Sequence, residues 1–168
     1  MVGLDGKEKI KAGNYSKGMK HRLTFARSMI NNPEIWFLDE PTTGLDPAIA
    51  SNIKDIIKEE NKKGVTIFLT THNMYIADEL CNRVAFIVDG KIRLIDSPKE
   101  LKLKYGEKLV EVESLRDGEL IRDSFSTVVE DEKNQLIQVI KENDLRTMHT
   151  KEATLEEIFI KVTGRGLV

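Results

Sequence analysis

The chain has 168 residues, enough for one domain or for one domain with a small appendage. Its 26 basic and 28 acidic residues give a net charge of −2, which excludes the basic excess expected of a nucleic-acid-binding protein. The single cysteine, Cys81, excludes an internal disulfide, and the longest apolar runs, residues 35–38 and 84–88, are far too short to span a membrane.

The first predicted element is a helix that begins at Ser16. Residues 1–14 before it are rich in glycine and lysine without a clear period, which predicts an irregular segment. The Asn31-Asn32-Pro33 sequence ends the helical pattern. The apolar residues spaced for one face of this helix are Met19, Leu23, Ala26 and Ile30.

A strand–helix–strand unit follows. Residues 35–38 are wholly apolar, which predicts a strand buried on both faces of a parallel sheet. Asp46 and Pro47 have the character of an N-cap and a first-turn proline, and the helix they open ends at Gly64. Residues 65–69 predict a second buried strand, joined to the first by a right-handed crossover. The core face of the connecting helix is predicted to carry Ile49, Ile53, Ile56 and Ile57.

A short helix is predicted over residues 73–81, and a hairpin comes next. Its strands are predicted at 84–88 and 91–95, because Asp89-Gly90 between them is typical of a two-residue turn. The Ser97-Pro98-Lys99-Glu100 sequence predicts a capping box with proline at the first helical position.

The sequence pattern changes after Gly106 to short apolar segments separated by polar stretches, and we expect a small α+β appendage there. Residues 109–112 and 136–140 predict strands, with polar stretches between them. A second capping box, Thr154 to Glu157, opens a helix that ends near Gly164. We therefore expect an α/β part over residues 1–105 and an accessory part over 106–168. The apolar face of the last helix is predicted to carry Leu155, Ile158, Phe159 and Val162.

Two carboxylates, Asp39 and Glu40, directly follow the first predicted strand. In parallel sheets, ligands bind beyond the carboxyl ends of the strands. An acidic residue there can hold Mg²⁺, and a second carboxylate can position or deprotonate a water that attacks a phosphate. The alternative is a strand that merely ends in surface acids. The structured turn predicted over residues 41–44 favours the functional interpretation.

Two further features are compatible with phosphate binding. Ser16-Lys17-Gly18 stands at a helix start, where free N–H groups and the helix dipole attract anions. For the tripeptide alone, an ordinary serine N-cap is the favoured interpretation, because serine caps are common. His72 follows the second strand and would lie near Asp39 and Glu40, where a histidine could contact a phosphate or a water. Taken alone, His72 is more typical of a helix cap or a core residue. Asp46 is expected to cap its helix in either case.

In order along the chain, these pieces resemble a known family. The sequences YSKGM (15–19), IWFLDEPTTGLDP (35–47) and TTH (70–72) resemble the second half of an ATP-binding cassette (ABC) domain, the motor of ABC transporters. The resemblance covers residues 14 to about 100 and implies part of a P-loop NTPase fold, with parallel strands and flanking helices. The YSKGM variant and the tail over residues 153–166 resemble the bacitracin-resistance and ABC-2 branch of exporters.

The resemblance implies a role for each matching residue. Asp39 would organise Mg²⁺, Glu40 would be the catalytic carboxylate, and His72 would contact the γ-phosphate of ATP. Residues 44–46, with Asp46, would form the D-loop. Ser16, Lys17 and Gly18 would belong to the signature motif. In this family the signature contacts the nucleotide of the opposite subunit, which implies a head-to-tail dimer of nucleotide-binding subunits.

The phosphate-binding loop of the family, Walker A, is not found in this sequence. The loop needs Gly, four residues, Gly-Lys and then Ser or Thr. Lysine follows glycine only at Gly6-Lys7 and Gly90-Lys91, where the next residues are Glu8 and Ile92. The resemblance therefore implies the C-terminal portion of a nucleotide-binding domain, expected to be inactive alone. Without a front half, the apolar faces of strand 35–38 would be exposed, and we expect non-native self-association.

The function implied is that of an ATP-binding and ATP-hydrolysing subunit of a bacterial ABC exporter. It would use ATP and Mg²⁺ and work with a separate membrane-spanning permease at the cytoplasmic face of the cell membrane. One alternative is a catalytically inactive ABC-like protein-interaction module, which the presence of Asp39, Glu40 and His72 disfavours. Another is a cassette ATPase that acts on nucleic acid or ribosomes, which the near-neutral charge disfavours.

Overall fold

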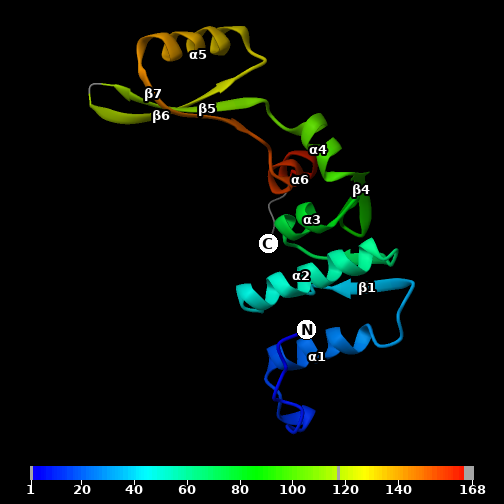
Figure 1. Cartoon of the computed structure of the whole chain (residues 1–168). Helices are drawn as coiled ribbons and strands as arrows, with labels where there is room; N and C mark the ends of the chain where they lie inside the picture. The colour runs from blue at the N-terminus through cyan, green and yellow to red at the C-terminus, as the bar shows by residue number, and fades with distance from the viewer. Residues whose placement is uncertain (1, 117, 165–168) are drawn as a thin grey trace. The chain divides into compact units, whose positions relative to one another are not determined.

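Helices and strands alternate along most of the chain, and they fall into two compact units (Figure 1). The computed structural model describes residues 2–116 and 118–164. The first unit ends at Cys81 and the second begins at Asn82. The combination of parallel strands with flanking helices confirms the predicted α/β class. The expected boundary at residue 105, between an α/β part and an accessory part, is a separate division and stays a prediction.

The first unit is built around one parallel strand pair. Strand β1 pairs with β2 in parallel, with Phe37 opposite Phe68 and Asp39 opposite Thr70, and α2 connects the two strands. This confirms the predicted strand–helix–strand unit. The elements of the unit are the 3₁₀ turn η1 (Ala12–Asn14), α1 (Lys17–Ser28), β1 (Ile35–Asp39), α2 (Pro47–Lys62), β2 (Thr66–Thr70) and α3 (Met74–Leu80).

The core of the first unit lies between α1, β1 and α2. The rings of Phe25 and Trp36 pack at a tilt of 47° with centroids 5.0 Å apart, and the indole N–H of Trp36 donates to the Ser28 hydroxyl oxygen at 2.8 Å. Ile53 and Ile57 of α2 are fully buried against them, as predicted. These contacts fix the helices against the strands that position the candidate site.

Expectations about burial in this unit are wrong for α1, β1 and β2, and no residue of β2 is buried. Of the residues predicted to face the core from α1, Leu23 and Ile30 are exposed, and Phe25 is the residue that the helix buries. Strand β1 is buried on one face only. Its inward residues are buried, whereas Phe37 is 72% exposed and lies 5.6 Å from the ring of the exposed Phe68. One face of the β1–β2 pair is therefore apolar and open.

The second unit starts with the predicted hairpin. Strands β3 and β4 pair in antiparallel fashion around Asp89 and Gly90, whose φ angles of 53° and 70° suit a two-residue hairpin turn. The elements of the unit are β3 (Val84–Val88), β4 (Lys91–Asp96), α4 (Pro98–Tyr105), β5 (Leu109–Arg116), β6 (Glu119–Ser126), α5 (Glu130–Glu142), β7 (Asp144–Lys151) and α6 (Leu155–Thr163).

A three-stranded antiparallel sheet and a helical pair make up the rest of this unit. The strand order is β6-β5-β7, with α5 along one face (Figure 1). Helices α4 and α6 lie together and bury Leu101, Leu155 and Ile158. The ring of Phe159 meets that of Phe86 edge-on at 5.3 Å, which ties α6 to the hairpin.

Some local expectations for the second unit need correction. Residues 136–140, predicted as a strand, belong to α5, while β6 and β7 were not predicted. Ser97 caps α4 as expected, but its own N–H donates to Asp96, so the reciprocal half of that capping box is replaced. The second box, Thr154 with Glu157, is complete. None of the helices in the described part of the chain has the length and apolar character needed to cross a membrane.

Candidate functional site

The carboxyl ends of β1 and β2 bring the predicted acidic and histidine residues together. Asp39 lies opposite Thr70 in the strand register, and the N–H of Glu40 donates to the carbonyl of Thr70 at 2.9 Å. The parallel pairing therefore continues one residue beyond β1. It places Glu40 directly beside His72, as expected for two strands that end at the same sheet edge.

Four contacts hold the carboxylate of Glu40. Its Oε2 accepts from the hydroxyls of Thr43 at 2.7 Å and Thr71 at 3.1 Å. Its Oε1 accepts from the backbone N–H of His72 at 2.8 Å and lies 2.7 Å from Nδ1 of the same histidine. Each oxygen is thus fixed from a different set of donors. Together these four contacts orient the carboxylate.

The electrostatics of Glu40 favour the ionised form. Partial burial alone would raise the pKa of Glu40, but the hydrogen bonds from Thr43, His72 and Thr71 outweigh it and lower the pKa below its ordinary value of 4.5. Glu40 is therefore a charged hydrogen-bond acceptor at neutral pH. The His72 side chain beside it is 67% exposed, so its ring is accessible to a ligand.

The backbone at Glu40 makes a sharp turn. Its φ angle is +45°, in the left-handed region that residues other than glycine seldom adopt. The carbonyl of Glu40 accepts from the N–H of Thr43 at 3.2 Å, and the intervening Pro41 is fully buried. Such a conformation costs about 1–3 kcal/mol and persists when surrounding contacts determine it. Here the turn aims the Glu40 side chain back toward the β2 end.

Asp39 offers a separate acidic group at the same edge. Its Oδ1 accepts from the hydroxyl of Thr70, and the residue is exposed. No cluster of three or more potential metal-binding side chains occurs among the described residues. Mg²⁺ commonly uses one or two carboxylates together with waters and phosphate oxygens. Asp39 therefore fits Mg²⁺ as a companion of a bound phosphate and would not make a metal site alone.

The Ser16-Lys17-Gly18 start of α1 lies next to the turn that opens α2. The Ser16 hydroxyl accepts from the N–H of Met19 at 3.2 Å, so serine does cap the helix. A β-carbon placed on Gly18 would lie 3.9 Å from Cδ2 of Leu45, in ordinary contact. Lys17 is exposed. This start is therefore an accessible surface beside residues 44–46.

The remaining predicted site residue, Asp46, caps α2. Its Oδ1 accepts from the N–H of Ile49 at 3.1 Å, which confirms the expected N-cap. Among the described residues, no hydrogen bond or ion pair joins the Ser16-Lys17-Gly18 segment to Asp39, Glu40 or His72. The structure thus gathers three predicted residues at one strand edge and leaves the signature-like segment separate from them.

Three threonines complete the site and were not predicted. Thr43 and Thr71 hold Glu40, and Thr70 holds Asp39. A usable signal was present in the sequence, because each threonine stands within three positions of the acidic pair or of His72. Hydroxyls so close to buried strand ends are placed to donate to the carboxylates there.

Comparisons with known proteins identify relatives of this chain. A family model described as "AAA domain, putative AbiEii toxin, Type IV TA system" matches residues 2–78. Over 99% of its length the chain is 49% identical to the fluoroquinolones export ATP-binding protein of Mycobacterium tuberculosis (strain CDC 1551 / Oshkosh) and covers 56% of that protein. It is also 35% identical, over 98% of its length, to 20% of ABC transporter A family member 9 of Arabidopsis thaliana.

A solved structure of the ATP binding subunit of an ABC transporter supports the same relationship. It superposes with a TM-score of 0.53 at 25% identity, over 56% of this chain and 40% of that one. The chain spans about half the length of the M. tuberculosis relative. From sequence identity along nearly its whole length, together with this structural likeness, the chain belongs to the ATP-binding cassette family of transporter ATP-binding proteins.

Proposed function

We infer that the chain is the part of an ABC exporter's ATP-binding subunit that acts on the γ-phosphate of ATP and on the attacking water. The observation that carries this proposal is the paired contact of Glu40 and His72 where β1 and β2 end. An ionised carboxylate with fixed orientation suits a group that positions or deprotonates a water. The exposed ring of His72 suits contact with a phosphate oxygen.

The remaining residues take roles around this pair. Asp39 would hold Mg²⁺, which neutralises the developing charge on the phosphates when it is bound. Ser16, Lys17 and Gly18 would present their helix start to the nucleotide of a second subunit, since among the described residues no hydrogen bond or ion pair joins them to Glu40 or His72. Asp46 would belong to the turn that meets that subunit. We place the nucleotide-binding part at residues 1–105 and an accessory part at 106–168.

The partners follow from the family. We propose a head-to-tail dimer with a second nucleotide-binding subunit and a membrane-spanning permease, at the cytoplasmic face of the membrane. The name of the M. tuberculosis relative, an export ATP-binding protein, supports export. The net charge of −2 gives no support to a nucleic-acid partner.

We further propose that the 168-residue chain alone binds Mg-ATP weakly and does not turn it over. Its sequence has no Gly-x₄-Gly-Lys-Ser/Thr loop, whose backbone and lysine hold the β- and γ-phosphates. A single exposed carboxylate, Asp39, cannot replace those contacts. The alternative of a catalytically inactive interaction module is not favoured. Such a module does not need a carboxylate held in one orientation, whereas four contacts orient that of Glu40.

The test is a chimera in which this chain is joined to the part of the M. tuberculosis relative that it does not span. We expect the chimera to hydrolyse ATP. Glu40→Gln should lower its kcat by about 10²–10⁴-fold, the usual contribution of a general base, and His72→Ala should act in the same direction. Glu59→Gln, the same chemical change at an exposed position of α2, should leave kcat unchanged.

Two results would contradict the proposal. An active chimera whose rate does not change with Glu40→Gln would remove Glu40 from the mechanism. Saturable binding and turnover of Mg-ATP by the 168-residue chain alone, followed by calorimetry and phosphate release, would show that it builds a phosphate site without the Walker A loop.

We also propose that the chain associates with itself through its open sheet face. Ile35, Phe37 and Phe68 are large apolar side chains exposed on β1 and β2. A contiguous apolar surface of this kind is favourable to bury.

A further inference from the structure

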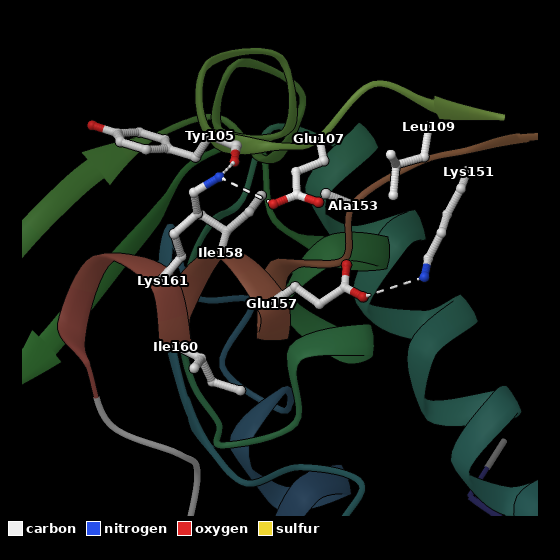
Figure 2. A pocket seen from close by; sticks show the side chains of 9 residues that line it. All are labelled: Tyr105, Glu107, Leu109, Lys151, Ala153, Glu157, Ile158, Ile160 and Lys161. Atoms are coloured by element: carbon white, nitrogen blue, oxygen red, sulfur yellow. Dashed lines mark hydrogen bonds and ion pairs between the residues drawn. The ribbon is translucent and has the colours of Figure 1, made fainter. Parts of the chain in front are cut away.

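A pocket of about 400 Å³ opens in the second unit, and it shares no residue with the candidate nucleotide site. It lies where the end of α4, the start of β5, the end of β7 and α6 meet (Figure 2). Its volume falls in the range of small-molecule sites, which is about 300–1,000 Å³. The pocket is therefore large enough for a small organic molecule.

The floor of the pocket is apolar. Leu109, Ala153, Ile158 and Ile160 contribute to its lining, and Ile158 is almost completely buried. Gly106 lets the chain pass close beside this floor, because a β-carbon there would lie 2.9 Å from the β-carbon of Ala153. Such a floor favours a ligand with an apolar body, since burial of apolar surface supplies most of the affinity.

The rim of the pocket carries two ion pairs on opposite sides. Figure 2 shows Lys161 beside Tyr105 and Glu107 on one side, and Lys151 with Glu157 on the other. The ammonium of Lys161 donates to the Tyr105 carbonyl at 3.1 Å and lies 3.7 Å from Oε1 of Glu107. The ammonium of Lys151 lies 4.0 Å from Oε1 of Glu157 and 3.7 Å from Oε1 of Glu111, a β5 residue outside the lining. The rim thus presents both signs of charge with no net excess.

The two ion pairs at the rim are weak enough for a charged ligand to replace one of the partners. Their N–O distances of 3.7 Å and 4.0 Å are long, and all four side chains are more than 40% exposed. Exposed pairs of this kind contribute little to stability. A ligand that carries its own charges can therefore replace one partner of each pair at small cost.

We propose that this pocket is a binding site for a small amphiphilic zwitterion, with the apolar body on the Leu109–Ile158 floor and its charges at the Lys161–Glu107 and Lys151–Glu157 pairs. A ligand with a single charge satisfies one side of the rim and leaves the other pair unused. A ligand with both charges matches the balanced rim. The site joins the strands β5 and β7 to helices α4 and α6, so an occupant would brace the sheet against the helical pair.

The experiment uses three fluorescent probes that share a dansyl group and differ in charge. They are Nα-dansyl-lysine, a zwitterion whose carboxylate and ammonium are separated by the lysine side chain, dansylcadaverine, which is cationic, and dansylglycine, which is anionic. Each is titrated into the full chain while dansyl emission is followed. We expect saturable one-to-one binding of Nα-dansyl-lysine, about tenfold tighter than either singly charged probe, because one charge-assisted contact is lost with each of those.

Variants locate the binding. Ala153→Trp fills the floor and should abolish the emission change, while Lys161→Met and Lys151→Met should each weaken binding about tenfold. Lys133→Met removes a lysine of comparable exposure and pairing on α5, outside the pocket, and should have no effect. Phe37→Ser, on the open sheet face of the first unit, should also have none. Circular dichroism checks that each variant is folded.

The proposal is overturned by absence of saturable Nα-dansyl-lysine binding to the folded chain, or by equal affinity for the three probes. It is also overturned if a folded Ala153→Trp chain still binds. Should that variant fail to fold, Ile160→Ser decides, because Ile160 is an exposed pocket residue: weakened binding supports the site and unchanged binding excludes it.

Discussion

At the scale of single residues, the carboxylate of Glu40 is fixed by donors from two separate loops. Thr43 comes from the turn after β1, and Thr71 and His72 come from the end of β2. A displacement of either loop therefore changes the orientation of the carboxylate. This makes the geometry of Glu40 a sensitive reporter of the relative position of the two strand ends.

Glu79 gives a prediction of pH dependence. Its carboxylate accepts from Lys54 and Lys58 of α2, each at 2.6 Å, and these hydrogen bonds, first that of Lys54, lower the pKa of Glu79 below its ordinary value of 4.5. Because the folded pKa is lowered, this stabilisation is present above pH 4.5 and is lost as the pH falls through the folded value. After solvent screening we expect about 0.5–1 kcal/mol.

The measurement is urea unfolding of the native chain and of Glu79→Gln at about pH 7 and about pH 3. The native chain should be the more stable at neutral pH, and the difference should shrink in acid. Glu59→Gln serves as the control. A difference that grows in acid would exclude the assigned role of Glu79.

The sequence was enough to predict that Asp39, Glu40 and His72 lie near one another, because each follows the end of an apolar run that forms a strand. It did not suffice for Thr43 and Thr71. A threonine near a strand end can face solvent, pack on an apolar neighbour or donate to a side chain, and all three leave the same sequence pattern. The turn at Glu40, with its positive φ, brings the carboxylate of Glu40 within reach of both hydroxyls, and the sequence pattern does not predict that turn.

At the scale of elements, α2 is the helix on which the first unit depends. It connects the paired strands, its N-cap Asp46 lies in the turn after the site, and Ile53 has no exposed surface. We expect Ile53→Ala to reduce the free energy of unfolding by about 3 kcal/mol, from lost burial and the cavity left behind.

Fluorescence of Trp36, the only tryptophan, follows this unfolding because the residue lies in the same core. Ile30→Ala makes the same deletion at a residue that is 73% exposed, so its effect should stay within about 0.5 kcal/mol. Equal losses for the two variants would contradict the burial assigned to α2.

Helix α5 shows why one element escaped prediction. Residues 136–140 contain four apolar side chains, two of them β-branched isoleucines and one valine, which is typical of a strand. The stronger signal lies upstream, where Glu130, Asp131 and Glu132 occupy the first helical turn and interact favourably with its dipole. The polar strands β6 and β7 were missed because their apolar residues alternate only weakly, and their pairing with β5 is non-local.

At the scale of the whole molecule, the open face of the β1–β2 pair governs association. We expect the native chain to form larger species as its concentration rises, and the Phe37→Thr/Phe68→Thr double variant to remain monomeric over the same range. Threonine keeps strand propensity and removes the apolar ring. Sedimentation velocity measures the difference.

The matched control is Leu120→Thr, which removes an exposed apolar side chain from β6 in the other unit. It should leave association unchanged. A native chain that stays monomeric at high concentration would exclude this use of the open face.

The division into two units was harder to foresee than the fold class. Alternation of helices and strands follows from local periodicity, whereas a boundary depends on which contacts do not form. The change of sequence pattern at Gly106 comes just before the antiparallel sheet. Helix α4 precedes this change, but it packs with α6, far along the chain, and so belongs with the second unit.

Strands β1 and β2 pair only with each other among the described strands. Each therefore presents an outer row of backbone N–H and C=O groups, a geometry onto which a further strand can add through main-chain hydrogen bonds. Such an added strand would be selected by alternation: its inner side chains would extend the Trp36 core and its outer ones would widen the Phe37 face. The β1–β2 pair thus has two edges that can each accept a further strand, and the alternation of its side chains sets the register of that strand.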